Sequence, residues 1–275
     1  MPEIAAKAVV YAAALILVGV VATRLVLARR AGMADRVTAG ALAPVARVAW
    51  IALLAALAFR AWAHTAAVVG LADSVAFESL KTIAIDSRWG GTWRWQTAAA
   101  LVGAAAEWTL RSRLGGLVGA GVTLGLVVAI ARGGHTEAIP ARVLLHATHV
   151  VAGGIWLGTL AVVAAVSRRR DADRGRLLQA FSMLAMVGAA ALALTGALAA
   201  YTYVGAVSNL WATGYGRTLV VKLVFVTGAL GCGFVNWRSL RAPAASCSAP
   251  AVGWELWCAA AIVIATAVLT ELGHP

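Results

Sequence analysis

Two histidines three residues apart, His146 and His149, are the residues of this sequence best suited to chemistry. On a helix this spacing places both imidazoles on one face, close enough to share a metal ion or a hydrogen-bond network. Imidazole nitrogen binds copper, zinc, iron and nickel, so the pair alone does not select one metal. The sequence holds three further histidines, His64, His135 and His274. We expect these five residues to include the ligands of a metal site.

A second set of candidate ligands carries sulfur. Met183 and Met186 are also three residues apart, and Cys232 lies in the next apolar segment of the chain. Thioether and thiolate groups favour Cu(I), so these side chains could relay copper away from a nitrogen site. The alternative is structural, because methionine fills gaps in apolar cores and a buried cysteine behaves as a small apolar residue. Both interpretations stay open at this point.

The elements that position these residues are predicted to be membrane-spanning helices. Of the 275 residues 62% are apolar and 12% are charged, with a mean hydropathy of +0.86. Soluble domains are roughly 45–50% apolar and about 25% charged, so the composition excludes an ordinary soluble core. A spanning helix needs about 20 apolar residues. Such windows predict an all-α fold, a polytopic transmembrane helix bundle formed by residues 1–275 as a single domain. Its eight expected spans are 8–28, 43–63, 95–110, 114–131, 142–166, 177–205, 218–236 and 252–272.

The distribution of arginine predicts the orientation of this bundle. Short cytoplasmic loops carry an excess of Lys and Arg, and loops 29–42, 167–176 and 237–251 are rich in arginine. Eight spans place these loops on the cytoplasmic side, with both termini and all five histidines on the outer, periplasmic side. The longest outer loop, 64–94, could contain a short interfacial helix. The net charge of +12 is then mainly a topology signal and an attraction to the lipid bilayer, so we expect no nucleic acid partner.

Other patterns predict packing. Glu107 is placed to pair with Arg111 one helical turn further on. Three pairs of glycines have the spacing that allows two membrane helices to approach closely: Gly115 and Gly119, Gly121 and Gly125, and Gly154 and Gly158. Glu255 is expected to begin the last span at the inner surface. These residues are therefore interpreted as structural.

The stretch from His146 to Gly158, HATHVVAGGIWLG, resembles the signature helix of the copper resistance D (CopD) family. That signature is an apolar helix with a histidine followed two turns later by Trp and Gly. Further residues resemble family features: Thr195-Gly196, Tyr215-Gly216-Arg217 with Lys222 after it, and Asn236. The resemblance covers residues 140–241 and extends to 275, whereas over the first 130 residues only the span count and the Gly134-His135 turn fit.

The resemblance implies a multi-pass protein of the cell inner (plasma) membrane, linked to copper resistance or copper import. It also implies a separate periplasmic copper carrier of the CopC type as a partner. His149 matches the signature histidine and His135 a second family position, whereas His146, His64 and His274 rest on their expected outer location. We therefore expect copper to bind an outer-face histidine cluster and to pass toward the cytoplasm. The protein is not expected to be an enzyme, since HExxH, GxSxG and phosphate-binding motifs are absent from the sequence.

Two alternatives remain. In the first, the protein is a membrane oxidoreductase that binds haem b, with His149 and either His64 or His135 as axial ligands. The crowding of the histidines at one edge would leave room for at most one haem. In the second, the protein has a structural or assembly role and its histidines are incidental. The presence of copper, of a haem absorption band or of neither in the purified protein distinguishes the copper, haem and structural hypotheses.

Overall fold

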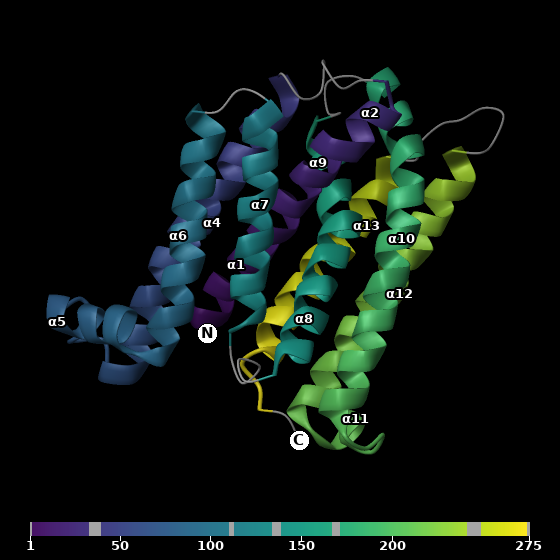
Figure 1. Ribbon diagram of the computed structural model, residues 1–275. Coiled ribbons are helices and arrows are strands. Elements are labelled where there is room, and N and C mark those ends of the chain that lie inside the picture. The colour runs from purple at the N-terminus through teal and green to yellow at the C-terminus, as the bar shows by residue number, and fades with distance from the viewer. Residues whose placement is uncertain are drawn as a thin grey trace.

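The computed structural model describes residues 2–32, 40–109, 113–133, 139–166, 171–240 and 249–273, and the regular structure within them is helical. Long helices lie side by side and alternate in direction (Figure 1). The predicted all-α fold is confirmed. The elements are α1 (Pro2–Ala22), η1 (Thr23–Leu27), α2 (Ala28–Arg30), α4 (Leu42–Val69), α5 (Phe77–Lys81), η3 (Thr82–Asp86), α6 (Arg88–Thr109), α7 (Arg113–Ala131), α8 (Pro140–Gly153), η4 (Gly154–Gly158), α9 (Thr159–Val166), α10 (Asp171–Val204), α11 (Asn209–Ala212), α12 (Gly214–Leu240) and α13 (Ala249–Leu269).

Six stretches of these helices are long and apolar enough to cross a bilayer, and they coincide with six of the eight predicted spans. Within the described ranges they are Pro2–Arg30, Leu42–Val69, Pro140–Val166, Arg176–Val204, Gly214–Ser239 and Ala251–Leu269. The two other predicted spans correspond to α6 and α7. The apolar stretch of α7, Gly115–Ala131, is shorter than the six, and α6 carries Arg88, Arg94 and Glu107. The short helix predicted in the 64–94 loop is α5.

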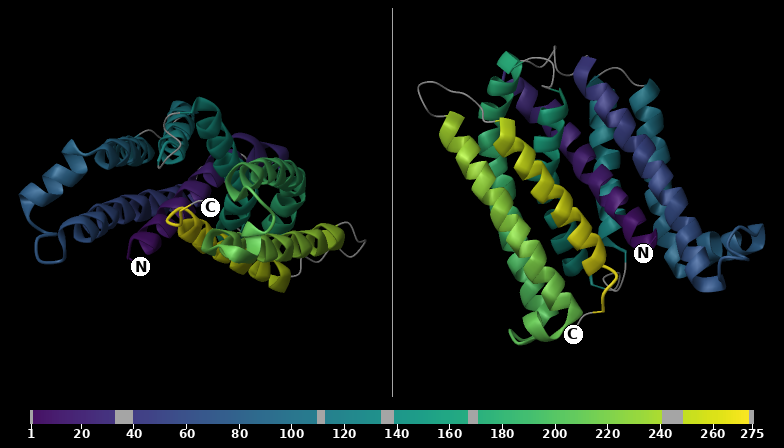
Figure 2. Two further views of the ribbon diagram at one scale, coloured as in Figure 1. Left: turned by 90° about the horizontal axis from the view of Figure 1, so that it is seen from below. Right: turned by 180° about the vertical axis from the view of Figure 1, so that it is seen from behind.

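The α1 helix lies between two groups of helices and contacts both. It packs against α4 and α7 on one side and against η4, α9 and α13 on the other. As a result α4, α6 and α7 lie on one side of α1, and the α8–α9 helix lies with α10, α12 and α13 on the other (Figure 2). Both ends of the chain lie at the same end of the bundle (Figure 1).

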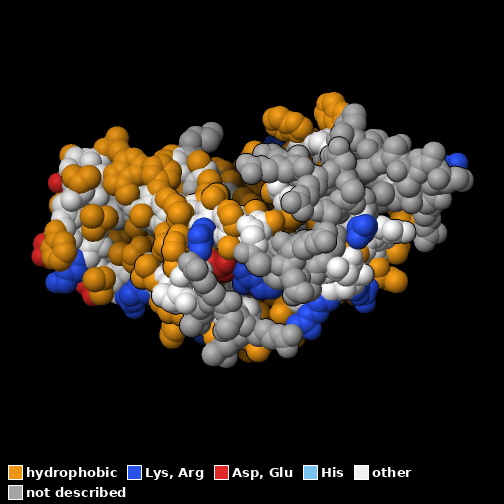
Figure 3. All heavy atoms as spheres, turned by 90° about the horizontal axis from the view of Figure 1, so that it is seen from above, with side chains coloured by type: hydrophobic (Ala, Val, Ile, Leu, Met, Phe, Trp, Pro, Cys, Tyr) orange, Lys and Arg blue, Asp and Glu red, His pale blue; other side chains and the backbone are white. Residues whose placement is uncertain are grey.

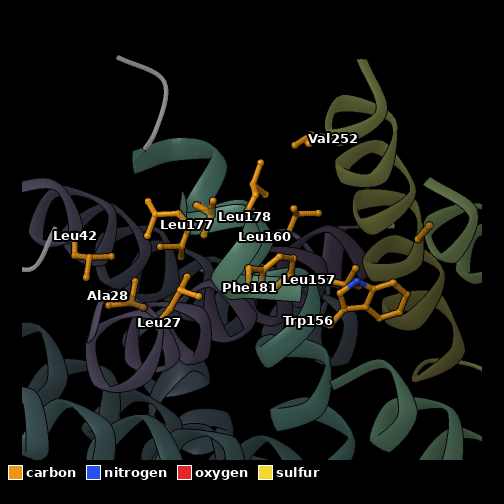
Figure 4. Packing of buried hydrophobic residues seen from close by; sticks show 14 of the residues in the cluster. Leu27, Ala28, Leu42, Trp156, Leu157, Leu160, Leu177, Leu178, Phe181 and Val252 are labelled. Atoms are coloured by element: carbon orange, nitrogen blue, oxygen red, sulfur yellow. The ribbon is translucent and has the colours of Figure 1, made fainter. Parts of the chain in front are cut away.

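Apolar side chains fill the junction between these two groups. Leu27 from η1, Leu160 from α9, and Leu177 and Phe181 from α10 are buried in one cluster with Val252 from α13 (Figure 4). At the end of the bundle opposite the termini, Lys and Arg side chains lie among apolar ones on the surface (Figure 3). Buried aliphatic packing therefore joins helices that are far apart in the sequence.

Two glycines set the distance between α1 and η4. A Cβ atom added at Gly158 would clash with the carbonyl oxygen of Leu15, and one added at Gly154 would clash with Val18. Gly19 faces the Gly158 backbone in the same way. The close helix approach predicted from the glycine spacing is therefore confirmed for Gly154 and Gly158, but it is wrong for Gly121 and Gly125, where nothing lies within 4 Å of an added Cβ atom. The backbone at this contact is π-helical, a local widening that often occurs at functional sites.

Glu107 pairs with Arg24, a partner that the sequence spacing did not indicate. The Arg24 guanidinium reaches from η1 to α6, and its Nη2 lies 3.0 Å from Glu107 Oε1. Both side chains are largely shielded from solvent, at 19% and 10% exposure. The helix α6 ends at Thr109, and Arg111 lies outside the described residues. The counter-charge comes from the Arg24 side chain of η1, a partner that sequence spacing does not reveal.

Candidate metal site on α8

His146 and His149 both face α10. The Nε2 atom of His146 lies 2.9 Å from the hydroxyl of Tyr203, and the two rings stack with centroids 5.6 Å apart. One turn further along α8, His149 Nδ1 lies 2.9 Å from Thr195 Oγ1. The predicted placement of the two imidazoles on one helix face is thus present, and the face they share is the one that packs against α10.

The Thr195 hydroxyl determines which nitrogen of His149 carries the proton. Thr195 Oγ1 donates its single hydrogen to the carbonyl of Ala191, at 2.7 Å, as a hydroxyl within a helix commonly does. It can then only accept from His149, so Nδ1 is the protonated nitrogen and Nε2 carries the lone pair. A metal-bound histidine is usually oriented by such a hydrogen bond from its other nitrogen.

Gly196 makes room for the ring of His149. A Cβ atom at this position would lie 3.4 Å from His149 Cε1, at the close limit of an ordinary van der Waals contact. The consecutive residues Thr195 and Gly196 thus provide the hydrogen-bond acceptor and the space for one imidazole. This contact between α8 and α10 gives a structural role to Thr195-Gly196, the dipeptide that resembles a family feature in the sequence.

Positive charge surrounds the pair of histidines. The Lys222 ammonium on α12 interacts electrostatically with His149. The guanidinium of Arg142 lies 5.8 Å from the centre of the Tyr203 ring, against which His146 stacks. A cation bound by His149 would be repelled by Lys222, so coordination to the imidazole must outweigh that repulsion. An anion bound together with the metal would relieve it.

His64 lies apart from this pair, near the C-terminal end of α4. Its Nδ1 is 3.2 Å from Glu3 Oε1 on α1, and its ring stacks on Trp89 of α6 with centroids 4.1 Å apart. The Arg60 guanidinium lies 5.4 Å from the centre of the same indole. Since α1 runs between α4 and α8, the structure does not bring His64 to His146 and His149 (Figure 2).

Two of the predicted ligands, His135 and His274, lie outside the described residues. Among the residues that the structure does describe, no group of three His, Cys, Asp or Glu side chains is arranged to hold a metal. Glu271, an acid three residues before His274, forms an ion pair with Lys7 of α1. The described part of the site therefore consists of the two α8 histidines and their partners on α10.

The sulfur ligands lie toward the other end of the bundle. Met183 and Met186 are about half exposed on α10, and Cys232 is partly buried on α12. Among the described residues these three form no metal-ligand group with acidic or histidine side chains. The structure therefore gives their positions without bringing them into one ligand set.

The structure also reveals a buried acid that was expected at the surface. Glu255 of α13 is only 2% exposed. Its Oε1 accepts a hydrogen bond from Trp156 Nε1 at 3.1 Å, and its Oε2 accepts one from Asn236 Nδ2 at 3.2 Å. Figure 4 shows the Trp156 indole pointing away from η4 toward α13. Two residues of the family resemblance, Trp156 and Asn236, thus converge on one carboxylate, a relationship that a search for acids within apolar segments could have found.

Residues 175–271 match the protein-family model of copper resistance protein D (CopD). The match includes Thr195, Lys222, Asn236 and Glu255, and begins after the α8 histidines. No curated protein and no solved structure gives a significant match to this chain. The resemblance that began at His146 is therefore supported independently over α10, α12 and α13. Residues 175–271 of this helical protein are therefore similar to the copper resistance protein D family, which is related to copper resistance.

Proposed function

We propose that the protein handles copper in the cell inner membrane: it binds copper at the outer end of α8 and passes it toward the cytoplasm. The family match supports a copper-resistance-related role. The proposal adds a binding site, a direction of transfer and a transport role rather than an enzymatic one. Copper is the substrate in this proposal and not a resident cofactor.

The observation that supports the site best is the state of the His149 imidazole. The hydrogen bond from Nδ1 to Thr195 leaves the lone pair on Nε2, and within the described part of the chain Nε2 makes no hydrogen bond. His146 lies one turn away on the same face. A neutral imidazole with an available lone pair is the form in which histidine binds copper. His135 and His274 are proposed as additional ligands, and His64 as a residue of the same outer end.

We further propose that all eight long helices cross the membrane. Six are apolar enough individually, and the α6–α7 hairpin packs against α1 and α4, so it lies beside them. The charge that makes α6 atypical is partly neutralised, since Glu107 pairs with Arg24. Eight spans put both termini and the α8 histidines on the periplasmic side, where a separate CopC-type carrier could deliver copper.

For transfer inward we propose the sulfur-containing side chains Met183, Met186 and Cys232 as a relay. Met183 and Met186 precede Thr195 on α10, and Cys232 follows Lys222 on α12, so all three lie toward the opposite end of the bundle. This order matches the chemistry, because thioether and thiolate groups hold Cu(I) more readily than hard oxygen ligands do.

The experiment that tests the proposal is a metal analysis combined with an absorption spectrum on one purified preparation. We expect about one copper per chain in the wild type and its loss in the His146→Ala/His149→Ala variant. His64→Ala is the matched control, because it removes an imidazole that is held by Glu3 and Trp89 on other helices. A Soret band would instead support the haem b alternative. The structural alternative would be supported if neither copper nor haem copurifies and cells carrying the double histidine variant keep the wild-type phenotype.

A further inference from the structure

A cavity of about 380 Å³ lies between α10 and α12, at the end of the bundle opposite the α8 histidines. Its walls are almost entirely apolar and include Phe181, Ala189 and Leu230. Glu255 and Asn236 line it as well, and each is nine-tenths or more buried. The cavity therefore combines an apolar interior with a localised polar site.

Within the described residues, the polar site has no positively charged partner for Glu255 and no donor for Asn236 Oδ1. The Glu255 carboxylate has two neutral donors, Trp156 and Asn236, and forms no ion pair with any described Lys or Arg. The Oδ1 atom of Asn236 is buried, and no described residue donates a hydrogen bond to it. Its amide cannot simply be reversed, because Oδ1 would then face the carboxylate. A buried charge without a counter-charge is costly, so a ligand with N–H donors and positive charge would be stabilised here.

The cavity opens toward lipid. At its rim Met186, Leu230 and Phe234 are 50%, 45% and 58% exposed, and they lie on two of the helices that are apolar enough to span the membrane. In a bilayer these side chains are surrounded by hydrocarbon, so the molecules with direct access to the opening are lipids. Glu255 follows the first residue of α13 by six positions, about 9 Å along a helix, which places it near a headgroup boundary.

We propose that this cavity is a binding site for a phospholipid with a primary ammonium headgroup, of the phosphatidylethanolamine type. The ammonium would donate hydrogen bonds to Glu255 and to Asn236 Oδ1, and part of an acyl chain would occupy the apolar space. A primary ammonium has three N–H donors and satisfies both acceptors together. The trimethylammonium of phosphatidylcholine has none, so it can neutralise the carboxylate but leaves Asn236 Oδ1 without a donor.

The test measures lipid bound to the purified full-length protein by native mass spectrometry, with phosphatidylethanolamine and phosphatidylcholine of identical acyl chains. We expect the wild type to bind the ethanolamine lipid at least tenfold more tightly. Glu255→Gln should bind the two lipids about equally, since the substitution removes the negative charge and keeps the shape of the side chain. Glu78→Gln is the matched control, because Glu78 is exposed on α5 and should leave the preference unchanged.

A second variant distinguishes lost binding from lost folding. Ala189→Phe places an aromatic ring in the cavity and leaves the carboxylate in place, so it should also abolish binding of the ethanolamine lipid. Helix content and melting temperature are measured for each variant. Equal binding of the two lipids by the wild type, or a preference that survives in a folded Glu255→Gln or Ala189→Phe variant, would overturn the proposal.

Discussion

The hydroxyl of Thr195 accepts a hydrogen bond from His149 Nδ1, at 2.9 Å, while it donates its own hydrogen to the Ala191 carbonyl. This relationship assigns the lone pair of the imidazole to Nε2 and holds the ring against α10. It therefore holds one histidine of the signature helix in the orientation that the proposed copper site requires. The first prediction tests it directly.

Thr195→Val should weaken copper binding by about 10–100-fold, the usual effect of removing a hydrogen bond that orients a metal-binding histidine. Valine has nearly the shape of threonine but cannot accept from His149, so the proton is no longer fixed on Nδ1. The measurement is a competition titration with a copper chelator. Thr195→Ser restores the hydroxyl and should bind copper nearly as the wild type does. Equal affinities of the Val and Ser variants would contradict the assignment.

Lys222→Met should strengthen copper binding, because it removes a positive charge that interacts with His149. The loss of this repulsion is expected to raise the affinity about tenfold, which corresponds to about 1.4 kcal/mol. Lys222→Arg keeps the charge and should leave the affinity unchanged. Weaker binding by the methionine variant would show that Lys222 supports the site instead.

Gly158→Ala should lower the free energy of unfolding by at least 1–3 kcal/mol, the typical cost of overpacking a tight contact. The added methyl group would meet the Leu15 carbonyl, which belongs to the backbone of α1 and cannot rotate away. Gly121→Ala is the matched control, since nothing lies within 4 Å of a Cβ atom there. Thermal unfolding in detergent measures both variants. A similar melting temperature for the two would show that α1 is free to shift away from η4.

Glu107→Gln should destabilise the protein by about 1–3 kcal/mol, because it leaves the largely shielded Arg24 without its counter-charge. In the double variant Arg24→Gln/Glu107→Gln most of this loss should be recovered. The full double-mutant cycle gives the coupling between the two side chains from unfolding measurements. Additive effects of the two single changes would argue against a direct ion pair between η1 and α6.

The sequence was sufficient to predict the helical fold and six spans, because long apolar windows in a membrane protein have few alternatives to a helix. It also predicted the shared face of His146 and His149, which depends only on helix periodicity. The four-residue spacing of Gly154 and Gly158 likewise predicted a close helix contact, since only the smallest side chains allow one.

What the sequence did not predict are contacts between distant segments. The pairing of Glu107 with Arg24 and the burial of Glu255 beside Trp156 depend on which helices are neighbours in space. The same holds for His64, whose partners Glu3 and Trp89 come from helices on either side of it in the sequence. Local periodicity specifies the face that a helix buries but not the helix that covers it.

Copper stoichiometry tests the central proposal most directly, measured together on the wild type, the His146→Ala/His149→Ala variant and His64→Ala. All three are purified in the same detergent, loaded with copper and freed of unbound metal. The account predicts about one copper per chain in the wild type and in His64→Ala, and close to none in the double variant. Full copper retention by a folded double variant would contradict a copper site on α8.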